Sequence, residues 1–193
     1  SLNKNEVRFL YFRDEETNAC WNAGLAPLME PVEGYQCTHR ISHTEIRSEK
    51  NGIAVSIRYF VPDEGFHEIW TVTLKNSSPR PRNLSVFAVV NFDLEGFQYP
   101  RYHEMDRTLQ AFYDEKLNGV FCQSAHHWAP HTRYNAFLAC SEKISGYDAN
   151  VKRFTGALGG YHRPQMLLDG NHCTGSSRSG YDLGGVLQNK LQL

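Results

Sequence analysis

The chain has 193 residues, which is the size of one domain and is enough to bury a real core. Hydrophobic residues make up 40% and aromatic residues 12%, a composition that excludes an intrinsically disordered chain. Lys and Arg number 20 against 21 Asp and Glu, so the formal net charge of −1 gives no general electrostatic reason to bind nucleic acid or an anionic membrane.

Apolar stretches such as Val86–Val90 are far shorter than the ~18 residues that a transmembrane helix needs. No signal-peptide pattern opens the chain. The five cysteines are an odd set with no close CxxC pair, which favours free thiols in a reducing compartment over a disulfide framework or a zinc site. We therefore expect a cytoplasmic protein.

The first predicted strands are joined by a turn dipeptide. His43–Glu49 is an extended run, and Ile53–Tyr59 alternates apolar and polar residues as a half-buried strand does. Asn51-Gly52 between them tolerates the positive φ angles of a tight hairpin turn. Trp70–Leu74 alternates large apolar residues with threonine and predicts a further strand, while Leu84–Phe92 is apolar on both faces, as expected between two packed layers.

Asn118-Gly119 predicts a second hairpin, between Leu109–Leu117 and Val120–Ala125. Ala136–Cys140 is a candidate for a short buried strand, and Ile144–Leu158 has room for a short helix. No window holds a longer helical period. These segments predict an all-β fold, a large antiparallel β-sandwich with long loops and at most short helices, in a single domain over residues 1–193.

The end of the chain alternates leucine with polar residues: Leu187, Leu191 and Leu193 alternate with Gln188, Lys190 and Gln192. The pattern stops at the last residue, with no turn or polar tail after it. A natural C-terminus usually frays in polar residues, so we expect the chain to be a piece of a longer protein.

The histidines are the first candidates for chemistry. His39 and His43 are four residues apart, which on a strand separates them by about 13 Å at ~3.3 Å per residue. His126, His127 and His131 gather in a second cluster. Strand geometry is poor for a shared metal ion, so solvated or core histidines are the simpler interpretation. We expect no metal ligands, with a small metal-dependent enzyme as an alternative.

Carboxylates and loop aromatics are the other candidates. Asp14-Glu15-Glu16, and Asp93 with Glu95, are pairs that could flank a glycosidic bond, although acids near turns are usually solvated or cap the turn. Aromatic rings near Asn, Arg and His can stack on sugars or simply pack the edge of the sandwich. These rings are Trp21, Tyr35, Tyr99, Tyr102 and Trp128. The sequence has no G-x-S-x-G elbow and no phosphate-binding loop.

Several motifs, in order along nearly the whole chain, resemble the N-terminal β-sandwich of cellobiose-phosphorylase-like enzymes, glycoside hydrolase family 94, which also includes cyclic β-1,2-glucan synthase modules. Tyr11–Trp21 looks like Y-L-R-D-x-x-T-G-E-x-W, and Ser48–Ile53 followed by Tyr59–Pro62 is similar to S-E-x-N-G-I … Y-F-V-P. Further matches are Trp70–Ser78 with Arg82–Phe87, Gly146-Tyr147-Asp148 with Phe154 and Gly156, and Asp182 with Leu187-Gln188.

The resemblance implies a galactose-mutarotase-like supersandwich and a multidomain parent enzyme. Members of the family cleave β-linked gluco-oligosaccharides with inorganic phosphate and inversion, and the catalytic Asp and the phosphate site lie on an α/α barrel. The resemblance therefore implies that this chain has no catalytic residue and no cofactor, and that it serves barrel packing, homodimerisation and the active-site entrance. A stand-alone module that binds an oligosaccharide is the alternative.

The sequence also departs from the family. Arg40 and Ser42 replace both glycines of an R-H-G-x-G-Y-T stretch, which would burden a loop that needs positive φ. Asn22–Leu25 differs from the run that usually follows the tryptophan, and Val151 stands where the family has Arg. If these loops approach substrate in relatives, this protein accepts a different sugar or uses the loops differently.

Four residues are predicted to contact sugar. Trp21 is the expected stacking platform, and Arg13, Asp14 and His39 are its expected polar partners.

Overall fold

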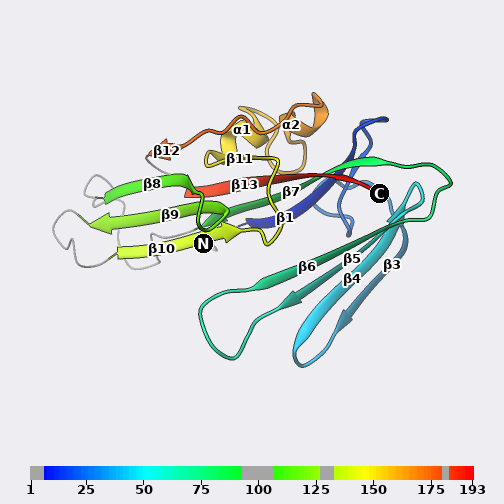
Figure 1. The fold of residues 1–193 in the computed structure, drawn as a ribbon, viewed down its shortest axis with the longest axis horizontal. Helices are drawn as coiled ribbons and strands as arrows, with labels where there is room; N and C mark the ends of the chain where they lie inside the picture. Colours follow the sequence, from blue (N-terminus) through cyan, green and yellow to red (C-terminus); the bar gives the residue numbers. More distant parts are fainter. Residues whose placement is uncertain (1–6, 93–106, 127–132, 180–182) are drawn as a thin grey trace. The chain divides into compact units, whose positions relative to one another are not determined.

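The computed structural model describes residues 7–92, 107–126, 133–179 and 183–193. Within these ranges the chain forms antiparallel sheets and two short helices (Figure 1), which confirms the all-β prediction. The strands are β1 (Val7–Asp14), β2 (Cys20–Trp21), β3 (Glu33–His39), β4 (His43–Lys50), β5 (Ile53–Phe60), β6 (Ile69–Asn76), β7 (Asn83–Phe92), β8 (Arg107–Asp114), β9 (Gly119–His126), β10 (Arg133–Ala139), β11 (Gly146–Asp148), β12 (Arg178–Ser179) and β13 (Leu183–Gln192). The helices are α1 (Val151–Thr155) and α2 (Gln165–Leu168).

Three sheets have the strand orders β11-β13-β7-β1-β2, β10-β9-β8-β12 and β3-β4-β5-β6. The chain divides into two compact units. The first unit comprises residues 1–10 and 86–190, and the second comprises residues 11–85 and 191–193. Strands β1, β7 and β13 each contribute residues to both units, and each unit is described by itself below.

The β3–β6 sheet of the second unit forms around the predicted hairpin. Lys50 pairs with Ile53, so the turn between β4 and β5 has two residues. Asn51 and Gly52 have φ angles of 51° and 80°, as a two-residue turn of this kind requires. The first hairpin prediction is therefore confirmed, and the strand predicted from Trp70 is confirmed as part of β6.

The register divides this sheet into an apolar and a polar face. Ile46, Ile57 and Val72 lie opposite one another in β4, β5 and β6, and side chains alternate between faces along each strand. On the apolar face, Ile53, Val55 and Ile57 are buried. The polar face carries Arg47, Ser56 and Thr73, which also lie opposite one another.

The β8–β9 hairpin of the first unit exists, but its turn differs from the prediction. Asp114 pairs with Gly119, so the connection has four residues and β8 ends before the predicted Leu117. The Asp114 carboxylate accepts hydrogen bonds from the backbone N–H groups of Lys116 and Leu117, at 2.9 and 3.0 Å, and this local bonding competes with the strand. Only Asn118 in the Asn-Gly pair has a positive φ.

Gly119 has a different role from the one its position in the dipeptide predicts. It begins β9, and a Cβ atom there would lie 2.2 Å from the carbonyl oxygen of Leu138 in β10. A glycine is needed because two backbones approach closely, rather than because a turn needs a positive φ.

Two predictions about burial in the first unit are wrong. Along β10, Ala136 and Leu138 are only half-buried and Phe137 is exposed, because β10 lies at the end of the strand order of its sheet. In β13, the alternation of Gln188 with the leucines predicts that it faces away from the core, but Gln188 is buried. Its Nε2 donates to His172 Nδ1 at 2.7 Å and its Oε1 accepts from the Cys173 N–H at 3.0 Å. A buried amide is tolerated where both of its ends are bonded.

Other side chains of the first unit form its core. Ala111, Val120, Cys122, Ala149 and Leu187 form a buried cluster, and the half-buried residues of β10 pack against it. Helix α1 falls inside the predicted range. Asn150 caps its N-terminus, with Oδ1 accepting a hydrogen bond from Lys152 N, and Phe154 is buried against Phe87 at 5.8 Å between ring centroids. Strand β7 is buried on both faces over most of its length, as predicted.

Candidate functional site

Three of the four predicted sugar-contact residues come together where β1 pairs with β2. Phe12 pairs with Trp21, and Arg13 pairs with Cys20. The Trp21 ring stacks on Phe12 with the centroids 5.7 Å apart, and the residue is only 1% exposed. A ring that is covered in this way has no free face for a sugar, so the expectation of a surface stacking platform finds no support in the geometry.

Asp14 closes the turn between β1 and β2. Its Oδ1 accepts hydrogen bonds from the N–H groups of Glu16 and Thr17 at 2.8 and 3.2 Å, and its Oδ2 pairs with the Arg82 guanidinium. Its backbone N–H donates to Ala19 O at 3.0 Å. Asp14 is fully buried, so its carboxylate is committed to the fold.

Arg13 is also buried, and it is paired within the chain. Its Nε and Nη2 both donate to Glu15 Oε1, at 3.0 and 2.9 Å. A charge-assisted bond of this kind stabilises a buried guanidinium. Arg13, Asp14 and Trp21 are therefore buried inside the fold and are not exposed at its surface.

Arg82 is the residue of this cluster that pattern analysis missed as a site residue. Its Nη2 pairs with Asp14, its Nη1 donates to Asn51 O at 3.1 Å, and its backbone N–H and C=O both bond Leu193 at 2.9 Å. Arg82 thus joins the end of β1, the β4–β5 turn and the last residue of the chain. We call the buried residues Arg13, Asp14 and Trp21, together with the half-buried Arg82, the buried cluster.

The fourth predicted residue, His39, lies elsewhere. It is exposed at the end of β3, where its Nδ1 is 3.0 Å from Thr44 Oγ1 and its Nε2 is 3.6 Å from Cys37 Sγ. The short turn to β4 is closed by a hydrogen bond from Arg40 N to His43 O at 2.8 Å. Neither Arg40 nor Ser42 has a positive φ, so the loss of the family glycines does not strain this turn.

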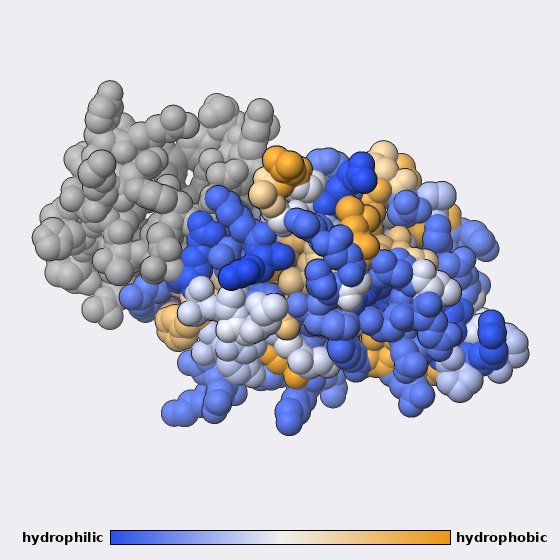
Figure 2. Space-filling model, turned by 90° about the horizontal axis from the view of Figure 1, so that it is seen from above, coloured by the Kyte–Doolittle hydropathy of each residue, from blue (hydrophilic) through white to orange (hydrophobic). Residues whose placement is uncertain are grey.

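Two connections of the β3–β6 sheet lie at the same end of the sheet. In an antiparallel sheet the β3–β4 turn and the β5–β6 connection lie at the same end, opposite the β4–β5 turn, as Figure 1 shows. We call residues 40–42 and 61–68 the loop end. Ile41 and Phe66 are fully exposed there, and Val61 is largely exposed. On the face shown in Figure 2, small hydrophobic groups are separated by hydrophilic residues.

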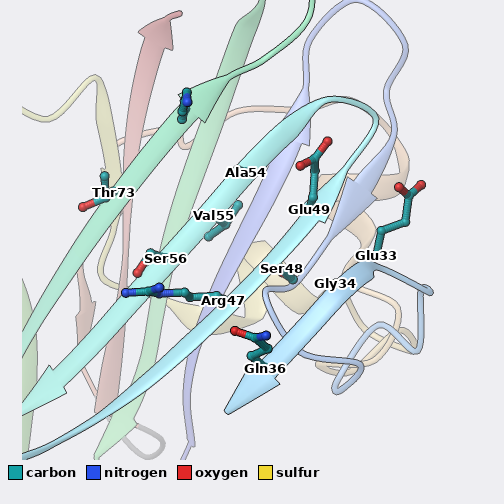
Figure 3. A pocket seen from close by; sticks show the side chains of 11 residues that line it. Glu33, Gly34, Gln36, Arg47, Ser48, Glu49, Ala54, Val55, Ser56 and Thr73 are labelled. Atoms are coloured by element: carbon teal, nitrogen blue, oxygen red, sulfur yellow. The ribbon is translucent and has the colours of Figure 1, made fainter. Parts of the chain in front are cut away.

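The polar face of the β3–β6 sheet holds a shallow groove of about 330 Å³ (Figure 3). Glu33, Gln36, Arg47, Ser56 and Lys75 are among its polar lining residues, and the described lining contains no aromatic ring. Arg47 Nη2 and Ser56 Oγ each donate to Glu45 Oε1 at 2.9 Å, and these two bonds lower the pKa of Glu45. The groove can therefore hydrogen-bond a polar group but offers no ring for stacking.

Other predicted candidates lie outside the described residues. They are Asp93, Glu95, Tyr99, Tyr102, His127, Trp128 and His131. In the described part of the chain, no group of three or more His, Cys, Asp or Glu side chains is arranged to hold a metal ion. Likewise, no helix of the described residues is long and apolar enough to cross a membrane.

Comparison with known proteins settles the family. A model described as the glycosyl hydrolase 94 supersandwich domain matches residues 3–193. The chain belongs to this family. It is 35% identical over its whole length to a solabiose phosphorylase of Paenibacillus borealis, of which it covers 25%.

Two further relatives are phosphorylases as well. A 3-O-beta-D-glucopyranosyl-beta-D-glucuronide phosphorylase of Paenibacillus borealis is 29% identical over 96% of the chain and 24% of the relative. An N,N'-diacetylchitobiose phosphorylase of Vibrio furnissii is 25% identical over 96% of the chain and 23% of the relative. The chain therefore corresponds to the supersandwich domain of glycosyl hydrolase 94 phosphorylases and spans about a quarter of the length of these relatives.

Proposed function

We propose that this supersandwich domain is a non-catalytic part of a phosphorylase that cleaves β-linked gluco-oligosaccharides with inorganic phosphate and inverts the anomeric centre. The observation that carries the proposal is the match of the whole chain to one quarter of several phosphorylases. The buried cluster supports a scaffolding role, because the charges of Arg13 and Asp14 are paired inside the fold. The reacting groups would then belong to a barrel in the rest of the enzyme.

The loop end is the surface that we propose contacts the rest of the enzyme, in the barrel or in a second subunit of a homodimer. Ile41 and Phe66 are fully exposed to water here. Covering apolar surface is worth roughly 25 cal/mol per Å², which favours a protein contact at such side chains. His39, at the base of the same turn, is the one predicted sugar-contact residue that is exposed, and we propose it as a polar contact at the active-site entrance.

A cytoplasmic location is part of the same proposal. All five cysteines are free thiols, which supports a reducing compartment.

The activity is tested with β-linked disaccharides and inorganic phosphate. The full-length enzyme is expected to release a sugar 1-phosphate, which is measured by coupled assay, and the 193-residue chain alone is expected to release none. Turnover by the isolated chain would contradict a scaffolding role. Hydrolysis without dependence on phosphate in the full-length enzyme would contradict phosphorolysis.

A further inference from the structure

An exposed thiol on β3 lies between two side chains that can bond it. Cys37 is exposed, and β3 is at the end of the order β3-β4-β5-β6. Tyr35 and His39 precede and follow Cys37 by two residues, which places all three side chains on one face of the strand. The Cys37 Sγ lies 3.6 Å from His39 Nε2, within the range of a thiol–imidazole hydrogen bond.

The imidazole of His39 is held by the neighbouring strand. Thr44 lies directly opposite His39 in the β3–β4 register, and its Oγ1 is 3.0 Å from His39 Nδ1. In the tautomer in which Nδ1–H donates to this hydroxyl, the lone pair of Nε2 faces the Cys37 thiol and can take a proton from sulfur. The arrangement has the parts of an activated thiol: a nucleophile, a base within reach, and a third group that orients the base.

The other cysteines are in different surroundings. Burial raises the pKa of Cys20 to about 11, although the charge of Arg13 opposes the rise, and burial raises the pKa of Cys122 to about 12. Cys140 is half-buried and its Sγ donates to Asn189 Oδ1 at 3.6 Å, and Cys173 is half-buried. Among the five cysteines, Cys37 is the one that is exposed. Thiolate formation and access to solvent decide which cysteine reacts.

We propose that Cys37 is a modification site at which the protein forms a mixed disulfide with a low-molecular-weight disulfide such as oxidised glutathione. His39 Nε2 takes the proton from Cys37 Sγ, and the thiolate attacks one sulfur of the disulfide. A new S–S bond forms to Cys37 as the old S–S bond breaks. The departing half leaves as a thiolate and takes the proton back from the imidazolium, so one thiol and one disulfide give one mixed disulfide and one small thiol.

The test follows each thiol with oxidised glutathione and with a chromogenic aromatic disulfide. The purified protein is quenched with acid at intervals, digested, and the modified cysteine is identified by mass spectrometry. We expect Cys37 to be modified first. The fast phase of the chromogenic reaction should disappear in Cys37→Ser.

Two matched variants distinguish the effect of the His39 imidazole on the reaction rate from the effect of thiol exposure alone. His39→Asn is expected to slow the reaction of Cys37 about tenfold. This is less than the ~10²-fold that a well-placed general base contributes to a rate, because bases in the solvent partly replace the imidazole. His43→Asn is the control, since His43 lies near the same turn but its Nδ1 bonds Ser42 Oγ at 2.9 Å. His43→Asn should change the reaction rate of Cys37 less than about twofold, because the proposed general base, His39, is unchanged in this variant.

Thr44→Val tests whether the orientation of the His39 imidazole matters. It keeps the imidazole but removes the hydroxyl that orients it, so the rate should fall between those of the parent and His39→Asn. Circular dichroism checks that each variant is folded. Equal rates in the parent and in folded His39→Asn, or earlier modification of Cys140 or Cys173, would overturn the proposal.

Discussion

The buried ion pair between Asp14 and Arg82 makes the sharpest prediction about stability. Arg82→Met removes the guanidinium but keeps a side chain of similar length. It leaves the fully buried Asp14 carboxylate with the N–H groups of Glu16 and Thr17 as its bonding partners, and it also removes the bond from Arg82 Nη1 to Asn51 O. Removal of one partner from a buried ion pair usually costs about 3–5 kcal/mol.

We expect a loss near the low end of that range, about 3 kcal/mol, because two backbone donors still bond the carboxylate. For a chain of this length, such a loss lowers the melting temperature by about 6–12 °C. Urea unfolding followed by tryptophan fluorescence gives the free energy of unfolding, with the slope checked for constancy between variants. The double variant Asp14→Asn with Arg82→Met should lose less than Arg82→Met alone, since no charge is then stranded.

A matched exposed pair provides the control. Arg47 and Glu45 are linked at 2.9 Å, but the Arg47 side chain is 60% exposed. Arg47→Met should therefore cost less than about 1 kcal/mol, as exposed pairs usually do. Equal losses for Arg82→Met and Arg47→Met would refute the argument that burial makes the first pair important.

Three further predictions rest on other parts of the chain. Because burial raises the pKa of Cys122 to about 12, the folded thiol stays protonated after the unfolded thiol ionises near pH 9. Stability should therefore fall above that pH by up to about 1.4 kcal/mol per pH unit, and the fall measured by chemical denaturation should be shallower in Cys122→Ala but unchanged in Cys37→Ala. Gly119→Ala should lower the melting temperature far more than Gly24→Ala. An added Cβ at Gly119 meets the Leu138 carbonyl oxygen at 2.2 Å, whereas at Gly24 it meets only the Tyr35 ring at 3.8 Å. Similar shifts would contradict the close-packing role of Gly119. Ile41→Asp should weaken self-association of the full-length enzyme, measured by sedimentation, or its activity, measured by phosphorolysis, while the melting temperature stays unchanged. Normal assembly and normal activity would argue against the loop end as a contact surface.

The sequence by itself determined strands β4, β5 and β6 closely, whereas β3 was not among the predicted strands. Asn51-Gly52 fixes a two-residue turn through positive φ angles, and the alternation in β5 then fixes which side chains share a face. Each of these signals is local, because turn conformation and strand periodicity depend on neighbours in the chain. The same local reasoning failed at Asn118-Gly119, where the Asp114 carboxylate and the approach of β10 decided the turn.

Only the tertiary structure decided where the predicted site residues lie. The motif from Tyr11 to Trp21 pointed to the right family, but charged residues and a tryptophan beside a turn predict exposure, and Arg13, Asp14 and Trp21 are buried. The partner that makes burial of Asp14 possible is Arg82, which lies 68 residues further along the chain. No local pattern encodes that pairing, because the cost of burying a charge depends on which distant group folding brings beside it.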